Sequence, residues 1–563
     1  MRHRHPLLTV GLIALVGFLT VCPVFMLLVG SLSEGLEAFG QFTLAKYVQA
    51  YTDPAFGAIL WNTVVFTLGS ALLATALALF LAYLNTRTNI PCKPLFGIIS
   101  IIPMMIPHIL FAVSWLLLLN PSNGILNLLL KELFGLDRAP FNIYSLPGMI
   151  LVEGLLDLPI AYLVLAPAMA SFDVSLEESS RVCGAANLRT LARITLPVLR
   201  PAILASITLV VVRSLASFAV PSVLGIPGRI YVLATHLYQI VATGYAPDYG
   251  LAAAVGMSVL AVSVALVYAY RHLTAESERF VTVSSRGYRP TTIDLKGARY
   301  PLFAAVGFLS SLLILLPVLV LVYTSLVPYT MVPSGRAFAL MSLKHWADVL
   351  RDPISLLSLK NSLFLGVVGA TLGSVLSVFV CYTIVKVRSA ASGILESLSF
   401  LSFSFPGIVV GIGFMWFFVR TPLYATIWAL LIGYIATYLP YGLRPMTSAF
   451  IQIHSHLEES SRVSGAGTLT TLRRIVIPLL VPGIVSGWIL MATMFVRELS
   501  LSVVLSRPGT EVLAVQILRF AEDGLWGRLS ALGILMIALS SALVIAATLI
   551  GRRLSPVEAA DRR

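Results

Sequence analysis

Charged side chains are scarce in this sequence. Asp, Glu, Lys and Arg supply 11% of the 563 residues, against about a quarter in soluble domains, while 58% of the residues are hydrophobic. This balance excludes a water-soluble globule. A bilayer core of about 30 Å requires about 20 consecutive apolar residues per helix, and about twelve such runs occur along the chain. The sequence therefore predicts an all-α polytopic membrane protein with about twelve transmembrane helices.

Paired cysteines and phosphate-binding loops are also lacking. The four cysteines show no CxxC spacing, so neither a disulfide framework nor a zinc site is indicated. No G-x-x-x-x-G-K-[ST] sequence occurs, so the chain cannot bind ATP through such a loop. A membrane-embedded enzyme is disfavoured because no His, Asp or Glu cluster has catalytic spacing. We expect no cofactor, no metal ion and no enzymatic activity on this chain.

Basic residues are in excess and give a net charge of +13. Such an excess could indicate nucleic-acid binding, but membrane proteins keep Lys and Arg in their cytoplasmic loops. If the N-terminus is cytoplasmic, the loops on that side carry 24 of the 38 Lys and Arg residues. We therefore expect both termini in the cytoplasm, contact with membrane lipid, and no nucleic-acid partner.

One segment of the chain occurs twice. The stretch LEESSRVCGAANLRTLARITLP, which begins at Leu176, recurs as LEESSRVSGAGTLTTLRRIVIP from Leu457. Residues 177–203 and 458–484 are identical at 17 of 27 positions, at an offset of 281. Further upstream the repeat continues at an offset of 299. Each half holds six predicted spans, and an even number returns the chain to the same face, so the halves are parallel repeats.

The duplication divides the chain into two predicted domains. We expect a first six-span domain over residues 1–270, a polar cytoplasmic linker over 271–300, and a second six-span domain over 301–563. Both copies of the repeated segment then face the cytoplasm, as loops over 173–200 and 454–481.

Each loop is predicted to contain two short helices joined by a glycine. Ser175 followed by Glu178 fits a capping box, and Gly184 can take the left-handed conformation that ends a helix. Ile194 lies on the apolar face of a second helix, which Pro197 closes. A two-turn helix is unstable alone in water, so the unit must be held by its own bundle and by a partner with two equivalent sites. An ordinary interfacial loop is the alternative.

A longer pattern joins the two loops. E-x-x-x-x-x-G, nine residues, then I-x-L-P occurs at Glu178, Gly184, Ile194, Leu196 and Pro197, and again at Glu459, Gly465, Ile475, Ile477 and Pro478. This resembles the EAA loop of the permease subunits of binding-protein-dependent ABC importers. Serine replaces alanine at 179, 180, 460 and 461, and isoleucine replaces leucine at 477. The resemblance covers essentially the whole chain as a fused pair of permease domains.

The resemblance implies a fold and a set of partners. It implies a type I ABC permease in the bacterial cytoplasmic (inner) membrane, a homodimeric cytoplasmic ABC ATPase that holds ATP and Mg²⁺, and an extracytoplasmic solute-binding protein. The first short helix of each loop would dock in a cleft of the ATPase and carry its closure to the membrane helices. The implied coupling residues are Glu177, Glu178, Ser179, Ser180, Arg181, Gly184, Ala185, Pro197, Glu458, Glu459, Ser460, Ser461, Arg462, Gly465, Ala466 and Pro478.

The segments 210–240 and 495–518 resemble the ferric-iron-type branch of these permeases. In that branch the second half reads as a basic residue, Glu-Leu, a hydroxyl-rich apolar run and Arg-Pro, as it does here from Arg497 to Pro508. The resemblance implies ferric iron as the solute. Related branches import thiamine, polyamines, phosphonates or sugar phosphates, and the choice rests mainly on the binding protein, so the sequence leaves the solute open.

Five charged residues fall within predicted spans, where charge is costly and marks functional candidates. Glu153 and Asp157 share a helix face and either line a cation pathway or pair with Arg213 on the following span. Arg497 and Glu498 are adjacent and point to different faces, so each needs its own partner. We expect these last two to stabilise the bundle.

Three uncharged polar residues lie in or beside other predicted spans. Asn62 and Asn361 stand near the outer ends of matching spans and are expected to form interhelical hydrogen bonds. His108 is expected to be a bonded interior histidine.

A proton- or sodium-driven secondary transporter of the six-plus-six kind is the rival class, because it would share the span count and the parallel repeat. Such carriers have a charged loop of the G-x-x-x-D-R-x-G-R-R type between spans two and three, whereas NTRTNIPCK stands here over residues 85–93. They also have no need for two docking loops. The sequence therefore favours the importer.

Overall fold

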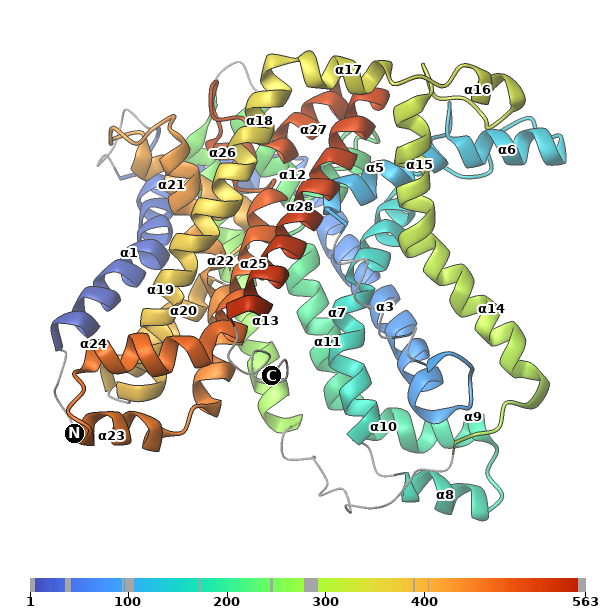
Figure 1. The fold of residues 1–563 in the computed structure, drawn as a ribbon. Coiled ribbons are helices and arrows are strands. Elements are labelled where there is room, and N and C mark those ends of the chain that lie inside the picture. Colours follow the sequence, from blue (N-terminus) through green and yellow to red (C-terminus); the bar gives the residue numbers. More distant parts are fainter. Residues whose placement is uncertain are drawn as a thin grey trace. The chain divides into compact units, whose positions relative to one another are not determined.

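Helices make up the regular structure of this chain. The structure is a computed structural model (Figure 1), and it describes residues 6–35, 42–93, 96, 106–171, 174–243, 247–277, 292–387, 390–402 and 405–554. Within these ranges the β-structure consists of two isolated bridges, Ser33 to Phe42 and Thr88 to Ile293. The predicted all-α class is confirmed.

The helices of the first half alternate long spans with short connecting helices. They are α1 (Pro6–Ser31), α2 (Ala45–Thr52), α3 (Phe56–Arg87), α5 (His108–Leu119), α6 (Ile125–Phe134), α7 (Leu146–Ser171), α8 (Ser175–Val182), α9 (Asn187–Thr190), α10 (Leu196–Val198), α11 (Arg200–Leu215), α12 (Leu233–Tyr238) and α13 (Tyr249–Ser277).

The second half repeats this alternation. Its helices are α14 (Arg299–Ser310), α15 (Leu316–Leu326), α16 (Gly335–Ala339), α17 (Lys344–Arg351), α18 (Pro353–Phe364), α19 (Ala370–Tyr382), α20 (Ala390–Leu401), α21 (Gly407–Phe418), α22 (Ile427–Gln452), α23 (Ser455–Val463), α24 (Thr468–Thr471), α25 (Ile477–Val496), α26 (Ser502–Leu505), α27 (Leu513–Glu522) and α28 (Trp526–Leu554). Single π-helical turns join several of these pieces into longer spans, as between α18 and α19.

Eight helical stretches of the described chain are long and apolar enough to cross a bilayer. A bent pair, 191–198 with 200–215, would be a ninth. The apolar run near residue 395 is split into α20 and α21 ahead of and behind Pro406, and the run near residue 95 crosses 97–105, outside the described residues. The chain is therefore polytopic, while the count of twelve spans stays a prediction.

The helices form two compact units that do not coincide with the two halves of the sequence. Unit 1 comprises Met1–Thr52, Leu237–Leu260 and His345–Arg563, and unit 2 comprises Asp53–His236 and Ala261–Lys344. Helix α1 packs on α20 and α21 in unit 1, whereas α15 packs on α5 in unit 2. The predicted domains 1–270 and 301–563 thus follow the duplication, and each unit contains the first span of the opposite half.

Close backbone approach explains how α1 joins unit 1. Gly30 lies against the indole of Trp416, and Gly413 lies against the backbone carbonyl of Pro23, so that a β-carbon at either glycine would overlap its neighbour. Small residues of this kind let transmembrane helices pack closely.

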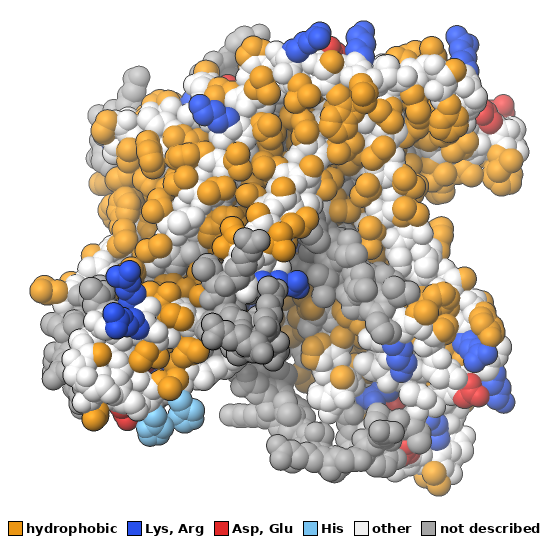
Figure 2. Space-filling view, viewed as in Figure 1, with side chains coloured by type: hydrophobic (Ala, Val, Ile, Leu, Met, Phe, Trp, Pro, Cys, Tyr) orange, Lys and Arg blue, Asp and Glu red, His pale blue; other side chains and the backbone are white. Residues whose placement is uncertain are grey.

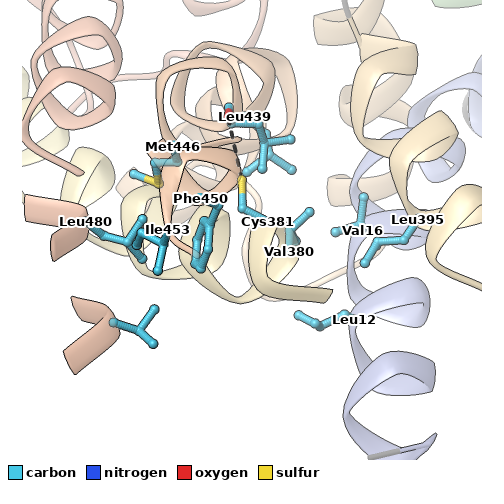
Figure 3. Close-up of a cluster of buried hydrophobic side chains, with 12 residues drawn as sticks. Leu12, Val16, Val380, Cys381, Leu395, Leu439, Met446, Phe450, Ile453 and Leu480 are labelled. Carbon is cyan, nitrogen blue, oxygen red and sulfur yellow. Dashed lines mark hydrogen bonds between the residues drawn. The ribbon is translucent and has the colours of Figure 1, made fainter. Parts of the chain in front are cut away.

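The core of unit 1 lies next to the second repeated loop (Figure 3). Side chains from α1, α19, α20, α22 and α25 meet there, among them Phe450 and Leu480, which are fully buried. Ile453 and Val476, at the two ends of the loop, belong to the same cluster. Figure 2 shows hydrophobic side chains along α18 and α28 of this unit, including exposed Leu356 and Ile545, as expected for lipid-facing helices.

The predicted linker is partly helical. Helix α13 continues to Ser277, and residues 278–291 lie outside the described residues. At the far end, the amide of Ile293 donates to the carbonyl of Arg87 at 2.8 Å, which attaches the linker to the end of α3. Hydrogen bonds from the Lys296 amide and the Asn89 side chain lower the pKa of Asp294 beside it.

Candidate functional site

The repeated segment folds in both copies as two short helices that meet at a glycine. In the first copy α8 ends at Val182, Gly184 follows two residues later with a φ of +82°, and α9 comes next. In the second copy α23 ends at Val463, Gly465 follows two residues later, also with a φ of +82°, and α24 comes next. We call residues 175–197 the first elbow and residues 455–478 the second elbow. The predicted helix–glycine–helix unit is confirmed in both, while residues 172 and 173 lie outside the described residues. The predicted closure by proline is wrong, because Pro197 lies within α10 and Pro478 is the second residue of α25, positions in the first turn of a helix that proline tolerates.

The turn at each glycine is closed by the same backbone hydrogen bond. The Ala185 amide donates to Ser180 O at 3.1 Å, and the Ala466 amide donates to Ser461 O at 3.1 Å. This bond from the residue after a left-handed glycine is the Schellman ending of a helix. No atom lies within 4 Å of a β-carbon placed on Gly184, so the backbone conformation, not the space, requires glycine.

A hydroxyl pair links the two arms of each elbow. Ser180 Oγ lies 2.9 Å from Thr190 Oγ1, and Ser461 Oγ lies 2.8 Å from Thr471 Oγ1. These serines occupy positions at which the EAA motif carries alanine. At 180 and 461 the departure from the motif is therefore explained by a cross-arm hydrogen bond.

The first glutamate of the first elbow is buried and held by its own unit. Glu177 is 2% exposed, and its Oε1 accepts a hydrogen bond from Thr195 at 2.8 Å and lies 3.6 Å from Arg87 Nε. Its Oε2 lies 3.6 Å from Arg181 Nη2. Arg87 also donates to the carbonyl of Met169 at 2.9 Å. One buried guanidinium thus joins the ends of α3 and α7 to the elbow.

The second elbow has the corresponding arrangement with a different base. Lys386 Nζ lies 3.0 Å from Glu458 Oε1 and donates to the carbonyl of Ile453 at 3.0 Å. Arg87 and Lys386 are matched at the offset of 299. Neither base was predicted as a functional residue, although the positive charge at two positions matched by this offset is a signal in the sequence that identifies them.

The second glutamate of each elbow is less buried than the first. Glu178 is half-buried, and the Glu459 side chain is 52% exposed, with Oε2 3.4 Å from His456 Nδ1. Matched apolar side chains are open to the surroundings to the same extent, with Val182 88% and Val463 90% exposed. Each elbow therefore presents an accessible tip.

The remaining predicted coupling residues also divide into exposed and half-buried ones. Ser179, Ser460 and Pro197 are exposed, Ala185, Ala466 and Pro478 are half-buried, and the side chain of Arg462 lies outside what the structure describes. The inner angle of the first elbow holds a cavity of about 280 Å³, lined by Ser180, Cys183, Gly184, Ala185, Arg189, Arg193 and Ile194. A second protein could contact the tip and this cavity without unfolding the elbow.

The charged residues of unit 2 form a cluster inside its helices. Asp157 is fully buried, and it accepts hydrogen bonds from Arg213 Nε at 2.9 Å and from Ser214 Oγ at 3.0 Å. Arg213 Nη2 lies 3.1 Å from His108 Nε2, so this histidine is a bonded interior residue, as expected. Glu153 accepts from Ser217 at 2.9 Å. Of the two readings of the sequence, the pairing with Arg213 holds for Asp157.

Unit 1 has a related cluster in which the donor and the acid have changed places between the two elements. Glu498 accepts hydrogen bonds from the Tyr438 hydroxyl and, at 2.7 Å, from the Leu501 amide. Arg497 has a separate partner, Met494 Sδ at 3.0 Å. At the offset of 281, Glu498 stands where unit 2 has Ser217. The acid therefore sits after the fifth span in unit 1 and on the fourth span in unit 2.

The asparagines were predicted to form interhelical hydrogen bonds, and both instead donate to backbone carbonyls of connecting segments outside the helices. Asn62 Nδ2 donates to the carbonyl of Tyr231 at 3.3 Å, and Asn361 Nδ2 donates to the carbonyl of Glu511 at 2.9 Å. Both acceptors lie in the segment that follows the fifth span, so the matched asparagines hold matched segments.

Comparison with known proteins agrees with this architecture. The family described as binding-protein-dependent transport system inner membrane component matches residues 74–276 and 369–556, more than half of the chain. The chain belongs to this family and is a multi-pass inner membrane permease with two copies of the family's domain.

Among its relatives are ferric transport permeases. The chain is 27% identical over 545 residues to the ferric transport system permease protein FbpB of Actinobacillus pleuropneumoniae, covering 95% of this chain and 76% of that protein. It is 28% identical over 495 residues to the putative ferric transport system permease protein FbpB 1 of Haemophilus influenzae, covering 87% and 75%. The spermidine/putrescine permease PotC of Escherichia coli is 26% identical over 208 residues, covering 37% of this chain and 79% of that protein.

Proposed function

We propose that this chain is the membrane permease of an ATP-driven importer that takes ferric iron from an extracytoplasmic solute-binding protein. The observation that carries the proposal is the pair of equivalent elbows, each with a buried glutamate that fixes it and an accessible tip. The ferric transport permeases match both halves of the chain in one protein, and ferric iron is therefore the proposed solute.

A separate cytoplasmic ATPase, working as a homodimer, would supply the energy. Its two equivalent subunits would each contact one elbow, with Glu178 and Glu459 making polar contacts and the left-handed glycines setting the angle between the arms. A ligand shifts a conformational equilibrium only through its different affinities for the two states. ATP-driven closing of the dimer would therefore favour one state of the permease, and its relaxation would open the pathway inward. This places both elbows and both termini in the cytoplasm.

We propose that the intramembrane acids stabilise the helix bundle. The guanidinium groups are proposed to contact the translocation pathway. Asp157 and Glu153 are at most 2% exposed and accept hydrogen bonds from their own unit, whereas the Arg213 side chain is 28% exposed. Because a charge facing lipid is costly, we assign the exposed part of Arg213 to a polar pathway. Arg497 is half-buried and follows the fifth span of unit 1, and it is assigned the same role. The adjacent Glu498 is buried and is assigned to the stability of the bundle.

The proposal is tested by replacing both hinge glycines. Proline has its φ fixed near −65° and cannot adopt the +82° of either glycine, and it also removes the Gly184 amide that donates to Arg181 O. Gly184→Pro together with Gly465→Pro should abolish uptake of radiolabelled ferric iron and co-purification of the ATPase. Insertion into the membrane should be retained. Full uptake by the double variant would contradict the coupling role, and the metal bound by the co-expressed binding protein checks the solute.

A further inference from the structure

The basic residue that ends the second span has the same two contacts in both halves. The membrane-spanning stretches 56–87 and 353–386 end at Arg87 and Lys386. Each base lies beside the buried glutamate of its elbow, and each donates to a carbonyl at the end of the fourth-span helix, that of Met169 or Ile453. The side chain changed between the copies while both contacts were kept.

Burial makes these ion pairs better suited to fixing geometry than to adding stability. The Arg87 and Glu177 side chains are 4% and 3% exposed, and those of Lys386 and Glu458 are 15% and 9% exposed. A buried ion pair gives little advantage over packed apolar residues because both charges must be desolvated. Loss of one partner is nevertheless costly, since the other is left buried without its countercharge. Such a pair strongly disfavours separation of the elements that it joins.

We infer that Arg87 and Lys386 are positioning residues that tie the first arm of each elbow to the ends of the second and fourth spans. Displacement of α8 or α23 then moves two membrane helices together. This inference rests on the proposed function, because the tie has a task only if a partner moves the elbows.

The glycine turns explain why such a tie is needed. The glycine and the cross-arm hydroxyl pair join the first arm to the second, whereas the base joins the first arm to the ends of two spans, through which a push on the tip reaches the bundle. In the first elbow Thr195 adds a second attachment between Glu177 and the other arm. The matching position in the second elbow is Val476, which has no side-chain donor. Loss of Lys386 should therefore impair coupling more than loss of Arg87.

The test uses the full chain, reconstituted with its ATPase and binding protein in proteoliposomes. Arg87→Met and Lys386→Met, singly and together, keep a long side chain but remove the charge. Allosteric coupling between sites is usually worth a factor of about 5 to 150. We therefore expect uptake and binding-protein-stimulated ATP hydrolysis to fall at least about fivefold, with Lys386→Met lower than Arg87→Met. The ATPase should still co-purify, because the tips are unchanged.

The molecule offers its own conservative controls. Because lysine and arginine already serve the same contacts in opposite halves, Arg87→Lys and Lys386→Arg should both support uptake close to that of the unaltered chain. Arg528→Met removes a partly exposed ion pair with Asp348 of α17, a helix at the end of unit 1 opposite to α23 (Figure 1), and it should also have little effect. If the methionine variants do not insert, Glu177→Gln and Glu458→Gln remove the charge from the partner side with little change in shape.

The outcomes separate this inference from the proposed function. Unchanged uptake with both bases replaced, or in both glutamine variants, would overturn the tie and leave the elbows as docking sites. Equal loss in the methionine variants and in their lysine or arginine counterparts would assign the bases to general packing and would also overturn it. If the unaltered chain neither binds the ATPase nor transports, the proposed function itself fails.

Discussion

The two elbows share a backbone and differ in the bonds that hold it. Both glycines have a φ of +82°, and the cross-arm hydroxyl pairs differ by 0.1 Å, at 2.9 and 2.8 Å. By contrast, the buried glutamate meets Arg87 in the first elbow and Lys386 in the second, and Thr195 is replaced by Val476. The shared property is thus the shape of the elbow, as expected if both copies fit equivalent surfaces of one symmetric partner.

The polar clusters of the two units differ more than the elbows do. In unit 2 two acids lie on the fourth span, and hydroxyl groups donate to them from the following segment. In unit 1 a tyrosine lies on the fourth span and donates to an acid in the following segment. In both units the fourth span is hydrogen-bonded to the following segment, but the acidic residue lies on the fourth span in unit 2 and in the following segment in unit 1. The interiors of the two units have therefore diverged more than the backbones of the two elbows.

The largest effect is expected from removing the acid that faces a guanidinium. Asp157→Ala leaves Arg213 without its carboxylate; breaking a buried ion pair costs about 3–5 kcal/mol, and because the Arg213 side chain is 28% exposed we expect the lower end of that range. Tyr438→Phe removes one neutral donor to Glu498 and should cost about 1–3 kcal/mol. Thermal unfolding in detergent checks both values. Equal losses of stability in the two variants would contradict the comparison, because they would show that the position of the acid in each unit has no consequence for stability.

A smaller effect is expected from making the first elbow like the second. Thr195→Val removes the hydroxyl that donates to Glu177 and introduces the residue present at 476. Hydrogen bonds to charged groups contribute about 1.5–3 kcal/mol, so unfolding should occur at a lower temperature. The Arg87 contact remains, and ferric uptake should persist. A variant that unfolds normally but no longer transports would show that the elbows are not interchangeable.

The smallest effect on stability is expected at the exposed glutamate. Glu459→Gln removes a surface pair with His456, and exposed ion pairs contribute about 0–1 kcal/mol. Its unfolding temperature should be nearly unchanged, whereas ATPase co-purification should weaken. Glu458→Gln, one residue earlier and 7% exposed, should lower the unfolding temperature more. The reverse order would contradict the division into a holding and a docking glutamate.

The local features were predictable from the sequence and the long-range contacts were not. The elbows follow from nearest-neighbour chemistry, because a glycine that can take φ of +82° after an acidic first turn ends a helix wherever it occurs. The exchange of first spans between units was not predicted, since an apolar helix such as α1 carries no local mark of which half it will pack on. Long-range fits, such as those of Gly30 against Trp416 and of Gly413 against Pro23, decide this.

The exposed residues of the elbows were predicted from the sequence, whereas the basic residues that hold the elbows to the membrane helices were not. Glu178, Gly184 and their counterparts carry a motif, whereas Arg87 lies far from Glu177 in the sequence and belongs to a different helix. The duplication contained the missing information, because the last basic residue of the second span is matched in both halves. Charges of the same sign at matched positions of a repeat therefore predict that Arg87 and Lys386 have equivalent roles.

Cross-linking at the elbow tips tests the central claim most directly. Cys183 is an exposed native cysteine in the first elbow, and the matching position in the second elbow is the exposed Ser464. In a background with Cys22 and Cys92 replaced by serine, where the remaining native Cys381 is buried, Cys183 should cross-link to the ATPase subunit in intact complexes. Ser464→Cys combined with Cys183→Ser should cross-link in the same way. ATP should change the yield at both positions. Cross-linking of either elbow to the extracytoplasmic binding protein, or of neither elbow to the ATPase, would contradict the account.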